Sequence, residues 1–338
     1  MRRAVLLALV LAGCPRGNKS KTIEPAQKKD AAAAGDAAAG DAATAELPPP
    51  APLPEVPKGL PPLPATGATP ELVAAGEVLF RDPRLATTGK LACTTCHDPA
   101  KGFSGTRQPT VTGQLNLRRS PALVDLAWKK AFGWGGRYPT LEAQLTAHVP
   151  GQLGDLAAAL QVLAADPQVS AQLARAGGAT PETALAALAA YVVTRYEGDA
   201  PWDRAERSGE PPAELKAGYQ LFTGKAQCAV CHPPPLYTDL GYHRLGLVAS
   251  HDEGRGRVDP AQQGAFATPT LRGAALRPAF FHDGSATTLD AAIDWHLAGG
   301  TGQGADPSIV DPALKKITLS QAERAQLGAF VRALSEGR

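Results

Sequence analysis

The sequence predicts an all-α protein in which two similar domains follow a long N-terminal tether. Three observations support this prediction. Helical periodicity recurs without a convincing set of alternating strands, one block of sequence occurs twice, and the first 67 residues lack the composition of a packed core. The remaining residues are enough for two domains, which we expect to span 68–205 and 206–338.

The N-terminus is typical of an exported bacterial lipoprotein. Residues 1–3 are basic, residues 4–12 form an apolar run too short to span a bilayer, and Leu11-Ala12-Gly13-Cys14 resembles a lipobox. We therefore predict a signal peptide at 1–13, a lipid on Cys14, and a location on the periplasmic side of a bacterial membrane. The alternative is a plain secretory signal with a cysteine at this position by chance.

Residues 14–67 are predicted to be a disordered tether. The segment 31–45 holds ten Ala in fifteen residues, and 48–64 holds nine Pro in seventeen, which favours extended polyproline II. Neither segment can bury enough apolar surface to offset the entropy of ordering it. We expect the tether to hold the folded part away from the membrane.

The helices of the folded part are predicted from their apolar periodicity, and Gly/Pro-rich loops join them. They cover Pro70–Phe80, Pro181–Tyr196, Ala213–Phe222 and Ser320–Leu334. Thr69 and Ser320 are the expected N-caps of the first and last of these helices. A short hairpin is expected near residues 237–247.

An internal repeat relates the two domains. The pattern Ala-Gly-x-x-Leu-Phe occurs at 75–80 and again at 217–222. Residues 121–148 then align without a gap over residues 269–296, with ten identities in 28 positions, and this alignment places His148 over His296. The chain therefore carries a duplicated unit, so a role argued for one half can be tested in the other.

Two C-x-x-C-H motifs carry the chemistry, and their residues are Cys93, Cys96, His97, Cys228, Cys231 and His232. In c-type haem attachment each cysteine bonds a vinyl group of haem and the histidine ligates the iron. A thioredoxin-like redox pair needs a βαβ context that this sequence lacks, and a structural zinc site would leave the adjacent histidines idle. We therefore predict two covalently bound haem c groups in cytochrome-c-like domains.

Composition narrows the partners, the cysteine chemistry and the iron ligands that this chain can have. A formal net charge of +2 argues against a nucleic-acid partner. Four of the five cysteines lie in the two motifs, so they do not form a distributed disulfide framework. Met1 is the single methionine, and hence no thioether can ligate iron in the mature chain.

The sequence resembles the bacterial dihaem cytochrome c peroxidases and their MauG-like relatives over residues 68–338. The matching motifs are Leu79-Phe80-x-Asp82-x-Arg84-Leu85, Ser120-Pro121-x-Leu123, Trp134-x-Gly136-Arg137, Thr268-Pro269-Thr270-Leu271-Arg272 and Phe281-His282-Asp283-Gly284-Ser285. The resemblance implies a peroxidatic haem in the N-terminal domain and an electron-transfer haem in the C-terminal domain. It also places Trp134 between the two haems.

The resemblance further implies the ligands of the second haem. In the family the sixth ligand lies eight residues after the Thr of a Thr-Leu pair, and counting from Thr288 gives His296. His232 and His296 are therefore expected to form a bis-histidine site, the alternative being that His296 lies on a helix surface. His282 is expected to hydrogen-bond a haem propionate, whereas His243 and His251 are expected at the surface or behind the site.

The first haem site departs from the family. No histidine lies between His97 and His148, so the removable distal histidine of the family is missing. Gln152 occupies the position of the distal glutamate, and an amide cannot shuttle a proton as a carboxylate does. We expect Gln144 and Gln152 on the distal side. For His148 three roles are open: a distal acid/base, a sixth ligand of the iron, or a residue on the helix surface.

A second departure concerns the calcium ion that the family holds between its domains. The resemblance places Arg119 and Arg277 where the family has its Asn and Thr ligands. Calcium takes oxygen ligands, which a guanidinium does not offer. We therefore predict that calcium is absent.

Together these features predict an enzyme that reduces hydrogen peroxide to water. Its electrons would come from a small redox protein, a cytochrome c or a cupredoxin. The alternatives are a MauG-like oxidase that acts on a protein or organic substrate, and a non-enzymatic dihaem electron carrier or sensor. We expect the protein to contact the membrane through its lipid anchor. The sequence does not decide whether the chain forms a homodimer.

Overall fold

The structure is a computed structural model that describes residues 47–247, 252–301 and 305–336. The predicted signal peptide, the lipidated Cys14, the tether as far as residue 46, and His251 lie outside these ranges. Among the helices of the described ranges, none has both the length and the apolarity needed to cross a membrane.

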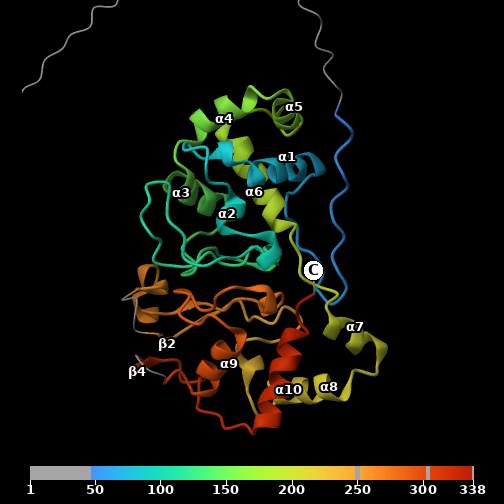
Figure 1. The fold of residues 1–338 in the computed structure, drawn as a ribbon, viewed down its shortest axis with the longest axis vertical. Helices are drawn as coiled ribbons and strands as arrows, with labels where there is room; N and C mark the ends of the chain where they lie inside the picture. The colour runs from blue at the N-terminus through green and yellow to red at the C-terminus, as the bar shows by residue number, and fades with distance from the viewer. Residues whose placement is uncertain (1–46, 248–251, 302–304, 337–338) are drawn as a thin grey trace, which may run out of the picture. The chain divides into compact units, whose positions relative to one another are not determined.

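The helices of the first half surround one apolar core (Figure 1). They are α1 (Pro70–Arg81), α2 (Cys93–Cys96), α3 (Leu141–Leu153), α4 (Leu156–Ala164), α5 (Pro167–Arg175) and α6 (Pro181–Val193). Helix α1 packs along α6. Helix α1 begins where predicted, because the Thr69 hydroxyl accepts a hydrogen bond from the backbone N–H of Leu72 at 3.3 Å.

The second half has its own apolar core, in which α8 packs along α10. Its helices are α7 (Pro201–Ser208), α8 (Ala213–Thr223), α9 (Leu289–Leu297) and α10 (Gln321–Arg332). The expected cap of α10 is confirmed: Ser320 and Glu323 form a reciprocal capping box. The expected domain boundary at 205/206 falls inside α7, whose Trp202 packs in this second core. Helix α7 therefore belongs with the second half.

The duplicated Ala-Gly pattern explains why each domain is built on a close pair of helices. A Cβ atom on Gly76 of α1 would lie 2.0 Å from the carbonyl oxygen of Ala187 in α6. A Cβ atom on Gly218 of α8 would lie 2.2 Å from the carbonyl oxygen of Gln326 in α10. Only glycine allows these two helix backbones to approach so closely. Each half therefore has a glycine at the contact between its two central helices.

Short strands accompany the mostly helical fold, but the hairpin expected near 237–247 is wrong. Strand β1 (Tyr242–His243) pairs antiparallel with β3 (Phe266–Ala267), and β2 (Leu245–Leu247) pairs antiparallel with β4 (Ala305–Val310). The two strands that are adjacent in sequence therefore belong to different sheets. Their partners come from distant loops, which local alternation does not reveal.

The Pro-rich segment also differs from the expectation of an unpacked tether that ends at residue 67. Arg175 donates to the carbonyl of Pro48 at 2.6 Å, and the indole of Trp128 donates to the carbonyl of Pro62 at 3.1 Å. An extended Pro-rich backbone has no internal hydrogen bonds, so its carbonyls are free to accept from side chains. Residues 47–64 therefore run along the folded part, and the expectation of a tether remains only for 14–46.

Candidate functional site

The two C-x-x-C-H motifs adopt the same local geometry. In each motif the backbone N–H of the histidine donates to the backbone carbonyl of the first cysteine, at 2.8 Å for His97 and 2.9 Å for His232. One turn of chain thus brings two thiols and an imidazole to the same cavity wall. All four thiols are free of disulfides. Burial raises the pKa of Cys93 and of Cys228 to about 12.

Both motif histidines are oriented through Nδ1. His97 donates from Nδ1 to the carbonyls of Pro121 at 3.0 Å and Phe103 at 3.2 Å. His232 donates to the carbonyl of Tyr237 at 3.0 Å. Phe103, six residues after His97, and Tyr237, five residues after His232, have φ of 51° and 52°, a left-handed conformation that turns the chain back toward the motif. In both halves Nε2 is left as the atom that can ligate a metal.

In the second cavity a second imidazole faces His232. His296 lies on α9, and its Nδ1 donates to the carbonyl of Ala292 at 2.7 Å. The ring centroids of His232 and His296 are 6.4 Å apart. Metal–imidazole bonds of about 2.0 Å would place two such rings about 6.3 Å apart across a linearly coordinated ion. The spacing of these two side chains therefore fits an iron ion between them.

Burial keeps these imidazoles neutral. It lowers the pKa of His232 to about 4, with a further contribution from His296, and it also lowers the pKa of His296. A neutral imidazole has a lone pair available for a metal. The second cavity has a volume of about 180 Å³, and its walls are mainly apolar. The residues present therefore suit a flat apolar cofactor with an axially ligated metal.

The first cavity is larger, about 590 Å³, and helix α3 forms its distal wall. Gln144, His148 and Gln152 all line it, because a spacing of four residues places side chains on the same helix face. His97 lines the same cavity. Among the ring contacts of the described residues, none joins His97 to His148, although the repeat places His148 over His296. His148 nevertheless acts electrostatically on His97, as His296 does on His232, so each cavity holds a second imidazole near its motif histidine and the halves differ in the ring contact.

The two glutamines of the distal wall have different partners. The Gln144 carbonyl oxygen Oε1 is buried and has no hydrogen-bond donor among the described residues. Gln152 instead exchanges amide hydrogen bonds with Asn116, at 3.0 and 3.2 Å. Sequence analysis missed Asn116, because nothing in the sequence ties this loop residue to a helix 36 positions away. Gln144 is therefore available to a bound molecule, whereas Gln152 is already paired.

Trp134 lies where both cavities meet. It is buried and lines both of them, and its indole N–H donates to the carbonyl of Arg119 at 3.1 Å. The guanidinium of Arg119 stacks over the indole, 5.0 Å from its centroid. Arg119 and Arg277, at the expected calcium-ligand positions, are both buried in the wall of the second cavity. The absence of calcium remains a prediction.

His282 and His243 both line the second cavity. His282 is buried, and its ring stacks on Phe266 with centroids 3.5 Å apart. His243 is half-buried and bridges two carboxylates, those of Asp239 and Asp311, each at 2.7 Å. Contact with the Cys231 thiol, followed by these carboxylates, raises the pKa of His243 to about 10.

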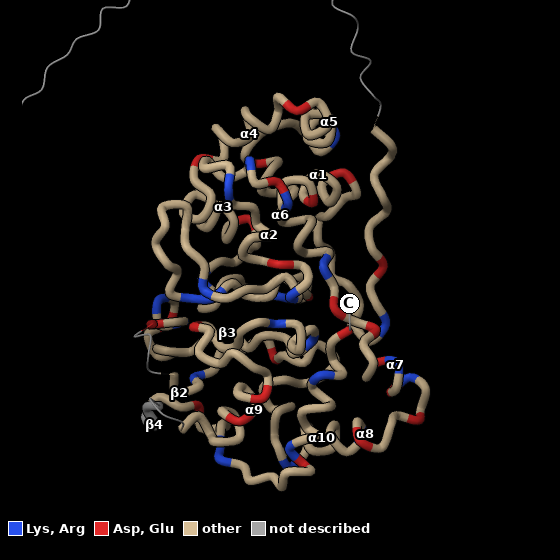
Figure 2. The backbone as a smooth tube through the Cα atoms, viewed as in Figure 1, with Lys and Arg blue, Asp and Glu red and all other residues tan. Residues whose placement is uncertain are grey.

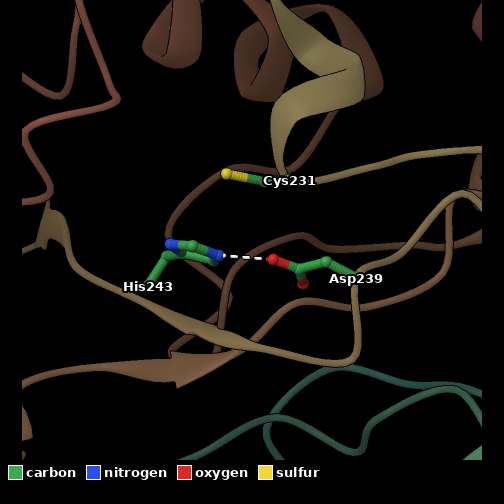
Figure 3. A group of neighbouring side chains, drawn as sticks. All are labelled: Cys231, Asp239 and His243. Carbon is green, nitrogen blue, oxygen red and sulfur yellow. Dashed lines mark hydrogen bonds and ion pairs between the residues drawn. The ribbon is translucent and has the colours of Figure 1, made fainter.

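Figure 3 shows Cys231, Asp239 and His243 gathered in a group that could hold a metal ion. Their potential ligand atoms lie within 4.8 Å of one another. Attachment of haem at this motif would convert the Cys231 sulfur into a thioether and remove it from this set. The group then becomes an imidazole held between two carboxylates beside the second cavity.

Comparison with known proteins identifies the family. The sequence model of the di-haem cytochrome c peroxidase family matches residues 70–210. Methylamine utilization protein MauG from Methylorubrum extorquens is 36% identical over 293 residues, covering 82% of this chain and 82% of that protein. Cytochrome-c peroxidase IdrP1 from Denitromonas iodatirespirans is 32% identical, covering 90% of this chain and 89% of that protein.

A solved structure shares the fold. The crystal structure of a MauG-like protein associated with microbial copper homeostasis matches with a TM-score of 0.76 and 25% identity, covering 83% of this chain and 95% of that one. With two matching motif sites and these relatives, the chain belongs to the di-haem cytochrome c peroxidase and MauG family of oxidoreductases, whose cofactors are haem c.

Proposed function

We propose that this protein reduces hydrogen peroxide to water with electrons from a small redox protein, a c-type cytochrome or a cupredoxin. The difference between the two cavities carries the proposal. In the second, His232 and His296 face each other at the spacing of two axial ligands. In the first, His97 and His148 line a cavity of about 590 Å³, and His148 acts on His97 electrostatically but makes no ring contact with it among the described residues. One open site and one closed site suit a reaction centre fed by an electron-transfer centre.

The residues of the first cavity have distinct proposed roles. Haem bound through Cys93, Cys96 and His97 supplies the redox chemistry. The free Oε1 of Gln144 accepts a hydrogen bond from a peroxide O–H and orients the substrate. His148 takes a proton from one peroxide oxygen and returns it to the other. Burial lowers its pKa, so the imidazole is neutral and able to accept that proton.

Gln152 is assigned a supporting role. It occupies the position of an acid in the family, but an amide does not titrate, and its hydrogen bonds to Asn116 hold it in place. We propose that this pair shapes the distal wall and leaves proton movement to His148. Trp134, which lines both cavities, is proposed to lie on the electron route between the sites.

The proposed location is the periplasmic side of a bacterial membrane. The support is sequence: a signal peptide at 1–13, a lipidated Cys14 and a tether over 14–46. Multiple acyl chains would anchor the protein stably, as a single chain does not. A Cys14→Ser variant should move from the membrane fraction to the soluble periplasmic fraction. Unchanged membrane retention would contradict the anchor.

A second candidate is a MauG-like oxidase that acts on a protein or organic substrate. The observation in its favour is the 36% identity to a methylamine utilization protein MauG. The two candidates differ in the fate of the oxidising equivalents. A peroxidase returns quickly to its resting state with a small donor, whereas an oxidase of this kind retains the equivalents until its own substrate arrives.

The test is peroxide turnover by the haem-loaded protein with a reduced cytochrome c or cupredoxin, with His148→Phe as the matched variant. The proposal predicts rapid, peroxide-dependent donor oxidation that the variant largely loses. A long-lived oxidised protein that ignores the donors would favour the MauG-like candidate. Failure to consume peroxide at all would contradict both and favour an electron carrier or sensor.

A further inference from the structure

Two buried arginines in the wall of the second cavity make their hydrogen bonds to backbone carbonyls. Arg119 is 2% exposed and Arg277 is 6% exposed. Their side-chain hydrogen bonds go to backbone carbonyls, those of Phe281 and Ser120 for Arg119 and that of Arg272 for Arg277. Asp283 acts on Arg119 only electrostatically, as Glu197 and Asp125 do on Arg277. Burial of a charge is costly unless hydrogen bonds and opposite charges compensate it, and a bound anion would add to both.

Most of the hydrogen-bond donors of these guanidiniums are unused. Each guanidinium has five N–H donors. Arg119 uses two of them, on the carbonyls of Phe281 at 2.6 Å and Ser120 at 3.1 Å. Arg277 uses one, on the carbonyl of Arg272 at 2.6 Å, and its Nε is buried without a partner. The two side chains therefore still offer donors to an acceptor that the described residues do not provide.

Arg272 shows how this chain satisfies a buried arginine from within. Its guanidinium is 1% exposed and forms a bidentate pair with Asp203, at 2.7 and 3.0 Å. It also donates to the carbonyls of Pro235 and Gly59, each at 2.8 Å. Arg119 and Arg277 instead donate to backbone carbonyls, although they are buried almost as deeply.

The charges of the two arginines also repel each other. Burial, followed by repulsion from Arg277, lowers the pKa of Arg119 to about 9, and burial lowers the pKa of Arg277 to about 10. Both are still protonated at neutral pH. A bound anion would relieve both the burial and the repulsion.

We infer that Arg119 and Arg277 form an anion site that binds the propionate carboxylates of the haem in the second cavity. Both residues line that cavity, and Arg119 also lines the first cavity beside Trp134. The planar guanidinium fork matches a carboxylate in shape and charge. Arg119 belongs to the first half and donates to Phe281 of the second, so the site would also join the halves through the cofactor. The inference rests on haem occupying this cavity, as the proposed function requires.

The test compares three variants of the haem-loaded protein: Arg119→Gln, Arg277→Gln and the control Arg255→Gln. Arg255 undergoes the same change of charge and also carries a buried Nε without a partner. It contacts the first half through the carbonyl of Gly135 at 3.3 Å, but it lines neither cavity. Spectroelectrochemical titration measures the reduction potential of each haem, and resonance Raman spectra report the propionate bending bands. Haem content and circular dichroism check folding.

The inference predicts that both cavity variants lower the potential of the second haem, because propionate charge without its counter-cation favours ferric iron. We expect about a tenfold shift in the oxidised-to-reduced ratio at a fixed potential, equal to about 59 mV. The propionate bands should shift as well, and Arg277→Lys should restore part of the potential. A shift no larger than that of Arg255→Gln, or unchanged propionate bands, would overturn the inference.

A free anion is the other source of the same chemistry. If phosphate or acetate fills the site, the potential of the wild-type second haem should change with the concentration of that anion at constant ionic strength. The inference predicts no such dependence. These readouts do not involve peroxide, so they can succeed when the peroxidase assay fails. Loss of the proposed function alone would therefore leave this site intact.

Discussion

The two cavities are copies of one design that differ at a single wall. Thr140 caps α3 and Thr288 caps α9 through equivalent hydrogen bonds, each 3.1 Å long. Eight residues after each cap stands a histidine. His296 faces His232 with ring centroids 6.4 Å apart, whereas His148 makes no ring contact with His97 in the described part of the chain. We propose that this duplicated fold supplies one closed and one open site from the same residue type.

The two cavities also differ in volume and in the polarity of their walls. The open cavity has a volume of about 590 Å³ and a polar wall formed by Gln144 and Gln152, whereas the closed cavity has about 180 Å³. Lys and Arg are intermingled with Asp and Glu in both halves of the described chain (Figure 2). Charge therefore does not distinguish the halves as a whole. The distinction is local and lies in the residues of the distal walls.

The largest expected effect is the loss of one cofactor. A variant with Cys228→Ala and Cys231→Ala should lose the second covalent haem and keep the first, and the pair Cys93→Ala and Cys96→Ala should do the reverse. Intact mass spectrometry measures this directly. A wild-type mass with one haem, or with bound zinc, would remove the basis of the comparison.

The next effect separates His148 from its counterpart His296. Replacing His296 with Gly should turn the second haem from low-spin to high-spin, because an axial ligand is lost. Replacing His148 with Phe should leave both spin states unchanged and lower kcat/KM for peroxide by about 10²-fold, the usual contribution of an acid–base group. Absorption spectra and steady-state rates give both readings. A spin change in His148→Phe would show that the two halves are alike.

A smaller effect should distinguish the two glutamines of the open site. Gln144→Leu removes a free acceptor from the cavity, and we expect a fall in kcat of about 10-fold to 10²-fold, near the lower end for a positioned polar group. Gln152→Leu removes a group already bonded to Asn116, so its main effect should fall on stability. Equal losses of kcat in both variants would contradict the separate roles.

The smallest effect tests the shared scaffold. Gly76→Ala and Gly218→Ala should each lower the free energy of unfolding by about 1–3 kcal/mol through overpacking of a helix pair. Denaturant titration measures this, with Gly151→Ala as the control because a Cβ atom there meets no atom within 4 Å. If one helix pair tolerates the methyl group and the other does not, the two scaffolds are less alike than their sequences indicate.

Local sequence signals predicted much of this structure. The caps of α1 and α10, the repeat and the two motif turns depend on residues close together in the chain, so their patterns are visible in the sequence. Strand pairing was missed because β1 and β2 find partners in distant loops. The pairing of Gln152 with Asn116 was missed for the same reason.

The N-terminal segment shows a different limit of sequence reasoning. Its composition correctly indicates that residues 47–64 have no core of their own. Composition does not reveal that side chains elsewhere, such as Arg175 and Trp128, offer donors to its carbonyls. The buried arginines Arg119 and Arg277 likewise gave a sequence signal only as departures from a family pattern, and their burial beside backbone carbonyls emerged from the structure.

The most direct test of one open and one closed site is an EPR spectrum of the fully oxidised, haem-loaded protein. We predict one high-spin ferric signal from the site of His97 and one low-spin signal from the site of His232 and His296, in equal amounts. A spectrum with only low-spin signals would show that His148 or another group closes the first site. Two high-spin signals would show that His296 does not ligate the second iron. Either result would contradict the account.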